Sequence, residues 1–227
     1  NPAFSGFIVS NGGYVNQELL EQFQPPNGKQ LYLYLANSKK DIYTIGSSDE
    51  LAERLSAQKM NHLTWTYEQF NEEIHESLAY TSLYQGLRFY YHNYGSKVFS
   101  DTKAFYDEGG LPGLKNYFKE RSERFGTDPA IDASTKNSLI WLAWKHNDFA
   151  SFDFFMDAFE EVLSTPRYAS AYWQNRLGQF YLKHGDPDHA IEYFTRGVTQ
   201  YPDPQFMTEM LAGLGSAYAL QNDIPTA

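Results

Sequence analysis

The sequence predicts an α/β segment followed by an all-helical segment. Short apolar runs alternate with amphipathic stretches over residues 4–92, a pattern typical of parallel strands joined by helices. From about Leu111 onward, apolar residues recur every three to four positions, which is the period of helices. Residues 171–204 add the spacing of a two-helix repeat. We therefore expect three regions: an α/β part over 1–98, a linker helix region over 99–130 and helical repeats over 131–227.

Composition bounds the class of protein. The 227 residues are 42% hydrophobic and 17% aromatic, enough for packed cores. The net charge of −10 argues against nucleic acid or an anionic membrane as the main partner. No apolar run approaches the roughly 20 residues that span a bilayer. The absence of cysteine excludes disulfides and leaves both a periplasmic and a cytoplasmic location open.

Three strands and two helices are expected in the α/β part. Phe4–Ser10, Lys29–Ala36 and Leu63–Tyr67 read as buried strands. A short helix covers Asn16–Gln24, and another begins at Ser48-Asp49. The opening residues read as an interior strand, so we expect this chain to be the C-terminal portion of something longer.

The second half reads as helices with clear boundaries. A helical stripe runs from Leu111 to Phe125 and stops at Gly126. Asp132 can start the next helix, and Phe149–Leu163 forms its partner. Asp186-Pro187 supplies a capping residue and a first-turn proline.

Residues 171–204 carry the most specific motif, with the offsets of a tetratricopeptide repeat: Leu177-Gly178, Tyr181, Gly185, Ala190, Phe194, Gly197 and Pro202. Leu214-Gly215 and Tyr218 begin a second, incomplete unit, and Asn147 stands where Gly185 does in a looser, earlier one. Position in the repeat places four residues on a mixed, peptide-sized concave face: Tyr172, Asn175, Gln179 and Leu182.

One histidine is the main candidate for chemistry. His75 lies in an acidic loop between an aromatic strand and a helix whose apolar positions include Leu83 and Leu87. Loops at the ends of parallel strands are where a general base is often held. The alternative is a solvated surface histidine. The six histidines show no i,i+4 pair, so we expect no metal site.

Three stretches carry a family resemblance: Gly6-Phe7-Ile8, His75-x-Ser77 with Leu83-Tyr84-x-Gly86-Leu87-x-Phe89, and Leu114-x-x-Tyr117-Phe118. Together with the repeat they resemble bacterial esterases of the α/β-hydrolase fold, the enterobactin-esterase-like group, some of which carry a C-terminal tetratricopeptide extension. The resemblance implies the C-terminal part of an α/β-hydrolase sheet followed by tetratricopeptide-like hairpins.

The resemblance also implies site residues. His75 would be the general base of a serine triad, and Asp41, the acid within Asn37–Asp41, would orient it. Other acids have structural readings instead. Asp49 and Glu50 suit the start of a helix, and the loop acids suit solvent: Glu72, Glu73 and Glu76.

The chain departs from the family at the nucleophile, because it contains no Gly-x-Ser-x-Gly elbow. Gly213-Leu214-Gly215-Ser216 falls inside a predicted helix. We therefore expect part of a serine esterase acting on a small ester, without a cofactor, and inactive as this chain alone. The alternative is a tetratricopeptide module, on a non-catalytic scaffold, that binds a protein partner or self-associates.

Overall fold

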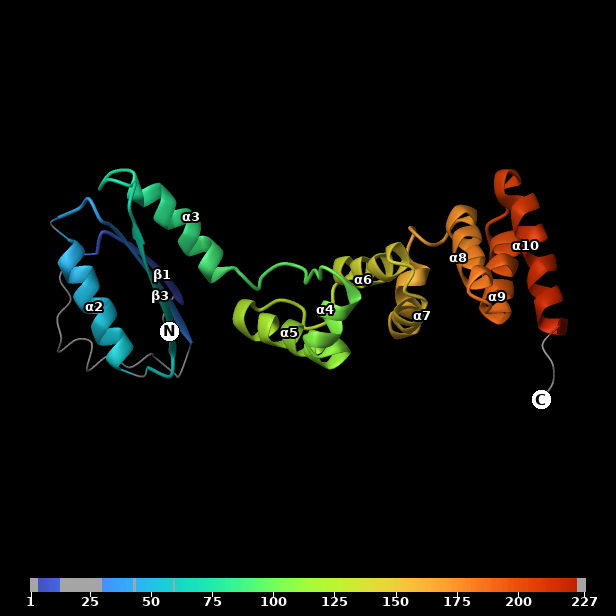
Figure 1. The fold of residues 1–227 in the computed structure, drawn as a ribbon, viewed down its shortest axis with the longest axis horizontal. Coiled ribbons are helices and arrows are strands. Elements are labelled where there is room, and N and C mark those ends of the chain that lie inside the picture. Colours follow the sequence, from blue (N-terminus) through green and yellow to red (C-terminus); the bar gives the residue numbers. More distant parts are fainter. Residues whose placement is uncertain (1–3, 13–29, 43, 59, 224–227) are drawn as a thin grey trace. The chain divides into compact units, whose positions relative to one another are not determined.

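Two compact units make up the chain in the computed structural model, which describes residues 4–12, 30–42, 44–58 and 60–223 (Figure 1). They comprise Asn1–Gly95 and Ser96–Ala227. The first contains a parallel sheet with helices, and the second consists of helices. The predicted order, α/β and then all-α, is confirmed. The expected helix over 16–24 lies outside the described residues, and the division at residues 98 and 130 stays a prediction.

The sheet of the first unit has three parallel strands in the order β1-β2-β3. They are β1 (Gly6–Ser10), β2 (Leu31–Ser38) and β3 (Leu63–Phe70). The register pairs Ser10 with Ala36 and Ser38 with Phe70. β2 continues two residues past its predicted end, and the added residues Asn37 and Ser38 are buried and hydrogen-bonded. β3 continues to Phe70, which pairs with Ser38.

Two helices cover opposite faces of this sheet (Figure 1). Successive side chains of a strand point to opposite faces, so β2 contributes to two cores. Tyr34 and Ala36 pack with α3 (Leu78–Tyr90), and Leu35 packs with α2 (Ile45–Ala57). The result is a helix–sheet–helix sandwich whose strands end at a common edge.

Helix α2 begins earlier than the sequence predicts. Its N-cap is Thr44, so Ser48-Asp49 lies inside the helix and the predicted start there is wrong. Ser48 is buried and accepts from Asn37 Nδ2 at 2.7 Å. Asp49 Oδ1 accepts from the Tyr67 hydroxyl at 2.7 Å. Serine and aspartate are common N-cap residues, but here their side chains form hydrogen bonds that link α2 to β2 and β3.

Helix α3 packs on the sheet with a face that does not include the apolar positions Leu83 and Leu87. Its buried residues are Leu78, Ser82 and Gly86, whereas Leu83 and Leu87 are 53% and 44% exposed. The small residues on this face let the helix approach the sheet closely, because a Cβ at Gly86 would lie only 2.6 Å from Ile8 Cγ1. The helix therefore carries a second apolar stripe in solvent, made of Tyr80, Leu83, Tyr84 and Leu87.

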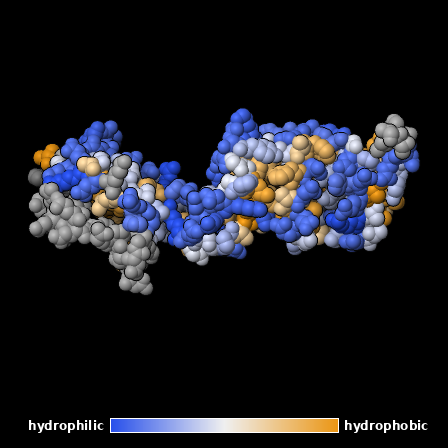
Figure 2. All heavy atoms as spheres, turned by 90° about the horizontal axis from the view of Figure 1, so that it is seen from below, coloured by the Kyte–Doolittle hydropathy of each residue, from blue (hydrophilic) through white to orange (hydrophobic). Residues whose placement is uncertain are grey.

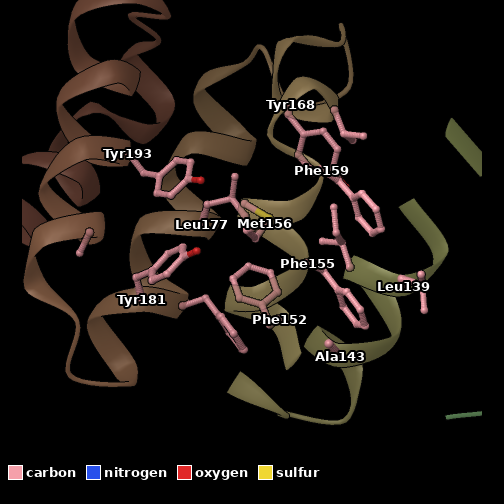
Figure 3. Packing of buried hydrophobic residues seen from close by; sticks show 14 of the residues in the cluster. Leu139, Ala143, Phe152, Phe155, Met156, Phe159, Tyr168, Leu177, Tyr181 and Tyr193 are labelled. Atoms are coloured by element: carbon pink, nitrogen blue, oxygen red, sulfur yellow. The ribbon is translucent and has the colours of Figure 1, made fainter. Parts of the chain in front are cut away.

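One continuous hydrophobic core holds the second unit together (Figure 3). The described elements of this unit are α4 (Thr102–Asp107), α5 (Gly110–Phe125), α6 (Ala133–Lys145), α7 (Phe149–Ala158), the 3-10 turn η2 (Glu160–Ser164), α8 (Ala171–Lys183), α9 (Pro187–Gln200) and α10 (Pro204–Asp223). The sequence did not predict α4, and α7 ends before the predicted Leu163, giving way to η2. On the visible face, apolar side chains gather on this unit amid a hydrophilic surface (Figure 2).

Local capping sets the helix boundaries of this unit. Asp132 and Asp186 each accept from the backbone N–H three residues on, as the sequence predicts. Gly126 ends α5 with φ +68°, in the left-handed region that glycine enters freely. Asn147 and Gly185, which follow α6 and α8, share this conformation with φ +54° and +76°. Their equivalence in the repeat pattern thus has a backbone counterpart.

Small residues let the last three helices approach one another. A Cβ on Gly178 would lie 2.7 Å from the Phe194 ring, so α8 and α9 meet at this glycine. The Tyr181 and Tyr193 rings stack beside it with centroids 5.4 Å apart (Figure 3). Packed consecutive helices agree with the repeat pattern, while the tetratricopeptide assignment itself stays a prediction. Of the described helices, none is both long and apolar enough to cross a membrane.

The close contact between Gly86 of α3 and Ile8 of β1 can be tested by adding a methyl group at Gly86. We expect Gly86→Ala to destabilise the first unit by about 1–3 kcal/mol relative to Gly46→Ala, because overpacking pushes Ile8 out of place. Gly46 lies in α2, and a methyl added there would meet nothing within 4 Å, so it controls for the added side chain. Hydrogen–deuterium exchange of residues 31–38 in urea measures the difference. Equal protection in the two variants would contradict the packing described.

Candidate active site

The candidate site lies where the three strands end. Asn11 and Gly12 follow β1, Asn37–Asp41 closes β2, and the loop 71–77 follows β3. Parallel strands bring their carboxyl ends to one edge of a sheet, and ligand sites of open α/β sheets lie there. Segments far apart in the sequence consequently meet at this edge.

His75 and Asp41 are in direct contact. The Nδ1 atom of His75 lies 2.6 Å from Oδ2 of Asp41. The carboxylate side chain is 1% exposed, whereas the imidazole side chain is 63% exposed. In the neutral ring this contact requires the proton on Nδ1, which leaves the lone pair on Nε2. Within the described part of the chain Nε2 has no hydrogen-bond partner, so it can exchange a proton with a bound molecule.

The contact changes the basicity of the histidine. The hydrogen bond to Asp41 raises the pKa of His75, and the charges of Asp41 and Glu76 act in the same direction, while partial desolvation opposes them. A raised pKa means that the pair stabilises the fold most at pH values below the pKa of unfolded histidine. This stabilisation is lost as the pH rises through the folded pKa.

Two of the loop acids, Glu72 and Glu73, have partners other than His75. The Glu73 carboxylate accepts from the hydroxyls of Ser77 and Thr81, and these hydrogen bonds lower its pKa. It thereby ties the loop to the start of α3. Glu72 pairs with Lys40 at 3.4 Å. Glu73 was expected in solvent, and its structural role was not visible because Ser77 and Thr81 are ordinary helix-start residues.

Sequence reasoning also missed Asn11. Its Nδ2 donates to the His75 carbonyl at 3.1 Å and lies 3.3 Å from His75 Nδ1. Its Oδ1 accepts from the Ser38 backbone N–H at 3.4 Å. These partners are 64 and 27 positions away in the sequence, so local pattern gives no signal for them.

A groove of about 580 Å³ in the second unit is a separate candidate for binding. Its lining comes from α6, the following turn, α8 and α10: Trp144, Lys145, Asn147, Asn175, Arg176, Gln179, Phe180, Lys183 and Glu209. Two of the four predicted face residues, Asn175 and Gln179, line it, while Tyr172 and Leu182 are not among the lining residues. The three cations face one acid, so the groove is more cationic than the mixed face that was expected.

Three polar side chains of this groove differ in how they are partnered. Asn175 is 4% exposed, and its buried Oδ1 has no hydrogen-bond partner among the described residues. The Arg176 guanidinium lies over the Trp144 ring, 5.3 Å from its centroid, and donates to the Tyr172 hydroxyl. Lys183 Nζ donates to Asn147 Oδ1 at 2.6 Å.

One cluster has the residue types of a metal site. Ligand atoms of Asp153, Asp186 and His189 lie within 4.8 Å of one another. Asp186 is the N-cap of α9, and its Oδ2 lies 2.7 Å from His189 Nδ1. Asp153 comes from α7, so the grouping is invisible to a search for histidine pairs in sequence. Asp186 and His189 already have a structural role at the start of α9, because Asp186 caps the helix through one oxygen and contacts the His189 ring through the other.

The pairing of His75 with Asp41 predicts a measurable titration. We expect Asp41→Asn to lower the pKa of His75, because the variant removes both the charged hydrogen bond and the nearby negative charge. Histidine NMR on the 227-residue chain measures the pKa. Asp49→Asn is the control, since that carboxylate binds Tyr67 and Gln69 instead. A His75 pKa that is equal in wild type and Asp41→Asn would show that the contact does not form in solution.

Comparisons with known proteins show fold similarity without a family. No family model and no curated protein matches the sequence. The crystal structure of an uncharacterised protein from Capnocytophaga ochracea DSM 7271 matches 96% of this chain with a TM-score of 0.59 and 17% sequence identity. The chain spans 62% of the length of that protein. An IroE-like serine hydrolase from Shewanella oneidensis matches 57% of this chain and 40% of its own, with 18% identity and a TM-score of 0.37. The first likeness shows a shared fold, and the second is too weak to support an argument.

Proposed function

We propose that this chain supplies the histidine and the acid of a serine esterase. The observation that carries the proposal is the contact between a buried Asp41 and the Nδ1 atom of a solvent-exposed His75 at the carboxyl edge of a parallel sheet. The acid holds the ring in one tautomer and leaves Nε2 outward, as a triad base requires. The resemblance to enterobactin-esterase-like hydrolases at the His75 loop and at α3 supports the same role.

In this mechanism the residues of the chain move one proton. Nε2 of His75 takes the proton from a serine hydroxyl as its oxygen attacks the ester carbonyl. The same nitrogen returns the proton to the alcohol when the carbon–oxygen bond breaks. A water then repeats the cycle to release the acid. The Asp41 carboxylate stabilises the imidazolium that exists between these transfers.

The nucleophile belongs to sequence outside these 227 residues in this proposal. No Gly-x-Ser-x-Gly occurs in the chain. Ser216, which follows Gly213-Leu214-Gly215, lies inside α10, and its hydroxyl donates to the Ala212 carbonyl at 3.1 Å. A serine within a regular helix does not offer the strained turn of a nucleophile elbow.

A second candidate function is capture of an acidic peptide by the second unit. We propose it because the groove on α6, α8 and α10 carries Lys145, Arg176 and Lys183 in a chain of net charge −10. The aromatic rings of Trp144 and Phe180 also line the groove, and Asn175 Oδ1, unpartnered within the described structure, can accept from a peptide N–H. The three cations would pair with the peptide's carboxylates. A binding role agrees with the tetratricopeptide reading of these helices.

The esterase proposal predicts a loss of turnover in the longer protein that contains this chain. We expect His75→Ala to lower kcat for p-nitrophenyl acetate by about 10³- to 10⁶-fold, because the serine loses its base. His62→Ala is the matched control, since His62 is exposed ahead of β3 and away from the carboxyl edge. The 227-residue chain alone should not turn over the ester. Equal rates in wild type and His75→Ala would refute the role of His75.

The binding proposal predicts charge selectivity. We expect a fluorescein-labelled hexaglutamate peptide to bind the 227-residue chain, and a hexalysine peptide not to bind, in fluorescence anisotropy at low salt. Lys183→Gln should weaken binding several-fold, whereas Lys119→Gln, on the exposed surface of α5, should not. Added salt should weaken binding by screening. Equal anisotropy changes for both peptides, or for both variants, would contradict the proposal.

A further inference from the structure

One residue contacts the ends of two strands and the candidate base. The backbone N–H of Asn11 donates to the Ala36 carbonyl at 2.9 Å, extending the β1–β2 ladder by one residue. Its side chain reaches Ser38, the last residue of β2, and His75 in the loop after β3. Asn11 therefore connects all three loops of the carboxyl edge.

We propose that Asn11 is a positioning residue, which holds the His75 loop so that the imidazole stays against Asp41. This inference rests on the proposed function, because it assigns a role within the same site. Asn11 acts through the His75 backbone and ring, so it is not itself a catalytic residue.

Hydrogen-bond chemistry fixes the orientation of the amide. Its oxygen accepts from the Ser38 N–H, and its nitrogen donates to the His75 carbonyl. A flipped amide would set a donor against the Ser38 N–H and an acceptor against the His75 carbonyl, so only one orientation satisfies both partners. Since the Nδ1 proton of His75 points to Asp41, the 3.3 Å contact from the Asn11 amide to Nδ1 is packing against the ring edge.

Backbone conformation explains the residue type. Asn11 has φ +50°, in the left-handed region where asparagine is enriched over other residues with a side chain. Glycine would adopt the same φ without strain but would offer no amide. Ser38 is fully buried, and its hydroxyl donates to the Glu73 carbonyl, so the strand end that anchors Asn11 also holds the loop of His75. The amide thus joins the end of β2 to the loop of His75.

The test removes the amide without straining the backbone. In Asn11→Gly, histidine NMR on the 227-residue chain should show a lower pKa for His75, because the ring spends less time hydrogen-bonded to Asp41. The neutral ring should also lose its preference for the Nδ1-protonated tautomer. The charges of Asp41 and Glu76, which raise the pKa of His75, are both retained in this variant. Asn147→Gly is the matched control, an asparagine with φ +54° in the other unit.

The outcomes separate this inference from the proposed function. Unchanged His75 titration and tautomer in a folded Asn11→Gly variant would overturn the positioning role, whatever the activity of the longer protein. If the longer protein is an esterase, Asn11→Gly should lower kcat by about 10- to 100-fold with little change in KM, because the base is misplaced and the substrate pocket is not. Absence of esterase activity would refute the proposed function while leaving the NMR result to decide on Asn11.

Discussion

Parallel pairing of β2 with both of its neighbours is the interaction on which the first unit depends. The hydrogen-bond register sets Ser10 beside Ala36 and Ser38 beside Phe70, so the chain leaves all three strands at one edge. Slipping a strand by one residue would turn its side chains to the opposite face and exchange the two cores that cover the sheet. The meeting of Asn11, Asp41 and His75 follows from this register, because each lies within a few residues of a strand end.

The candidate site combines a buried acid with an exposed base. Ionising a buried carboxylate is costly unless it is hydrogen-bonded, and the imidazole supplies part of that compensation for Asp41. The backbone N–H of Asp41 also bonds to the Ser38 carbonyl at 3.1 Å, which keeps the loop tight at the strand end. Because Asp41 is buried and held by the end of β2, it can orient the His75 ring while the ring itself remains exposed to solvent.

Sequence reasoning succeeded where the signals were local. The strands, the caps Asp132 and Asp186, and the stop at Gly126 depend on residues within one turn or one strand. His75 stood out by its place in an acidic loop after a strand, whereas its role as a base and the choice of Asp41 came from a family resemblance. The sequence could not establish their contact. Asn11 gave no signal because its partners come from other strands. The exposed stripe of α3 is the apolar pattern that stands out in the sequence, whereas the packing face uses Ser82 and Gly86, which carry little hydrophobicity.

The same stripe has a consequence for how the protein behaves at high concentration. β1, an edge strand of the described sheet, reads Gly-Phe-Ile-Val-Ser and contains neither a charge nor a proline, the features that usually discourage strands from joining those of another molecule. Leu83 and Leu87 expose further apolar surface on the helix that packs against it. Colloidal stability of the isolated chain therefore depends on its charge. Repulsion from a net charge of −10 opposes aggregation near neutral pH and weakens as salt is added or the carboxylates are protonated.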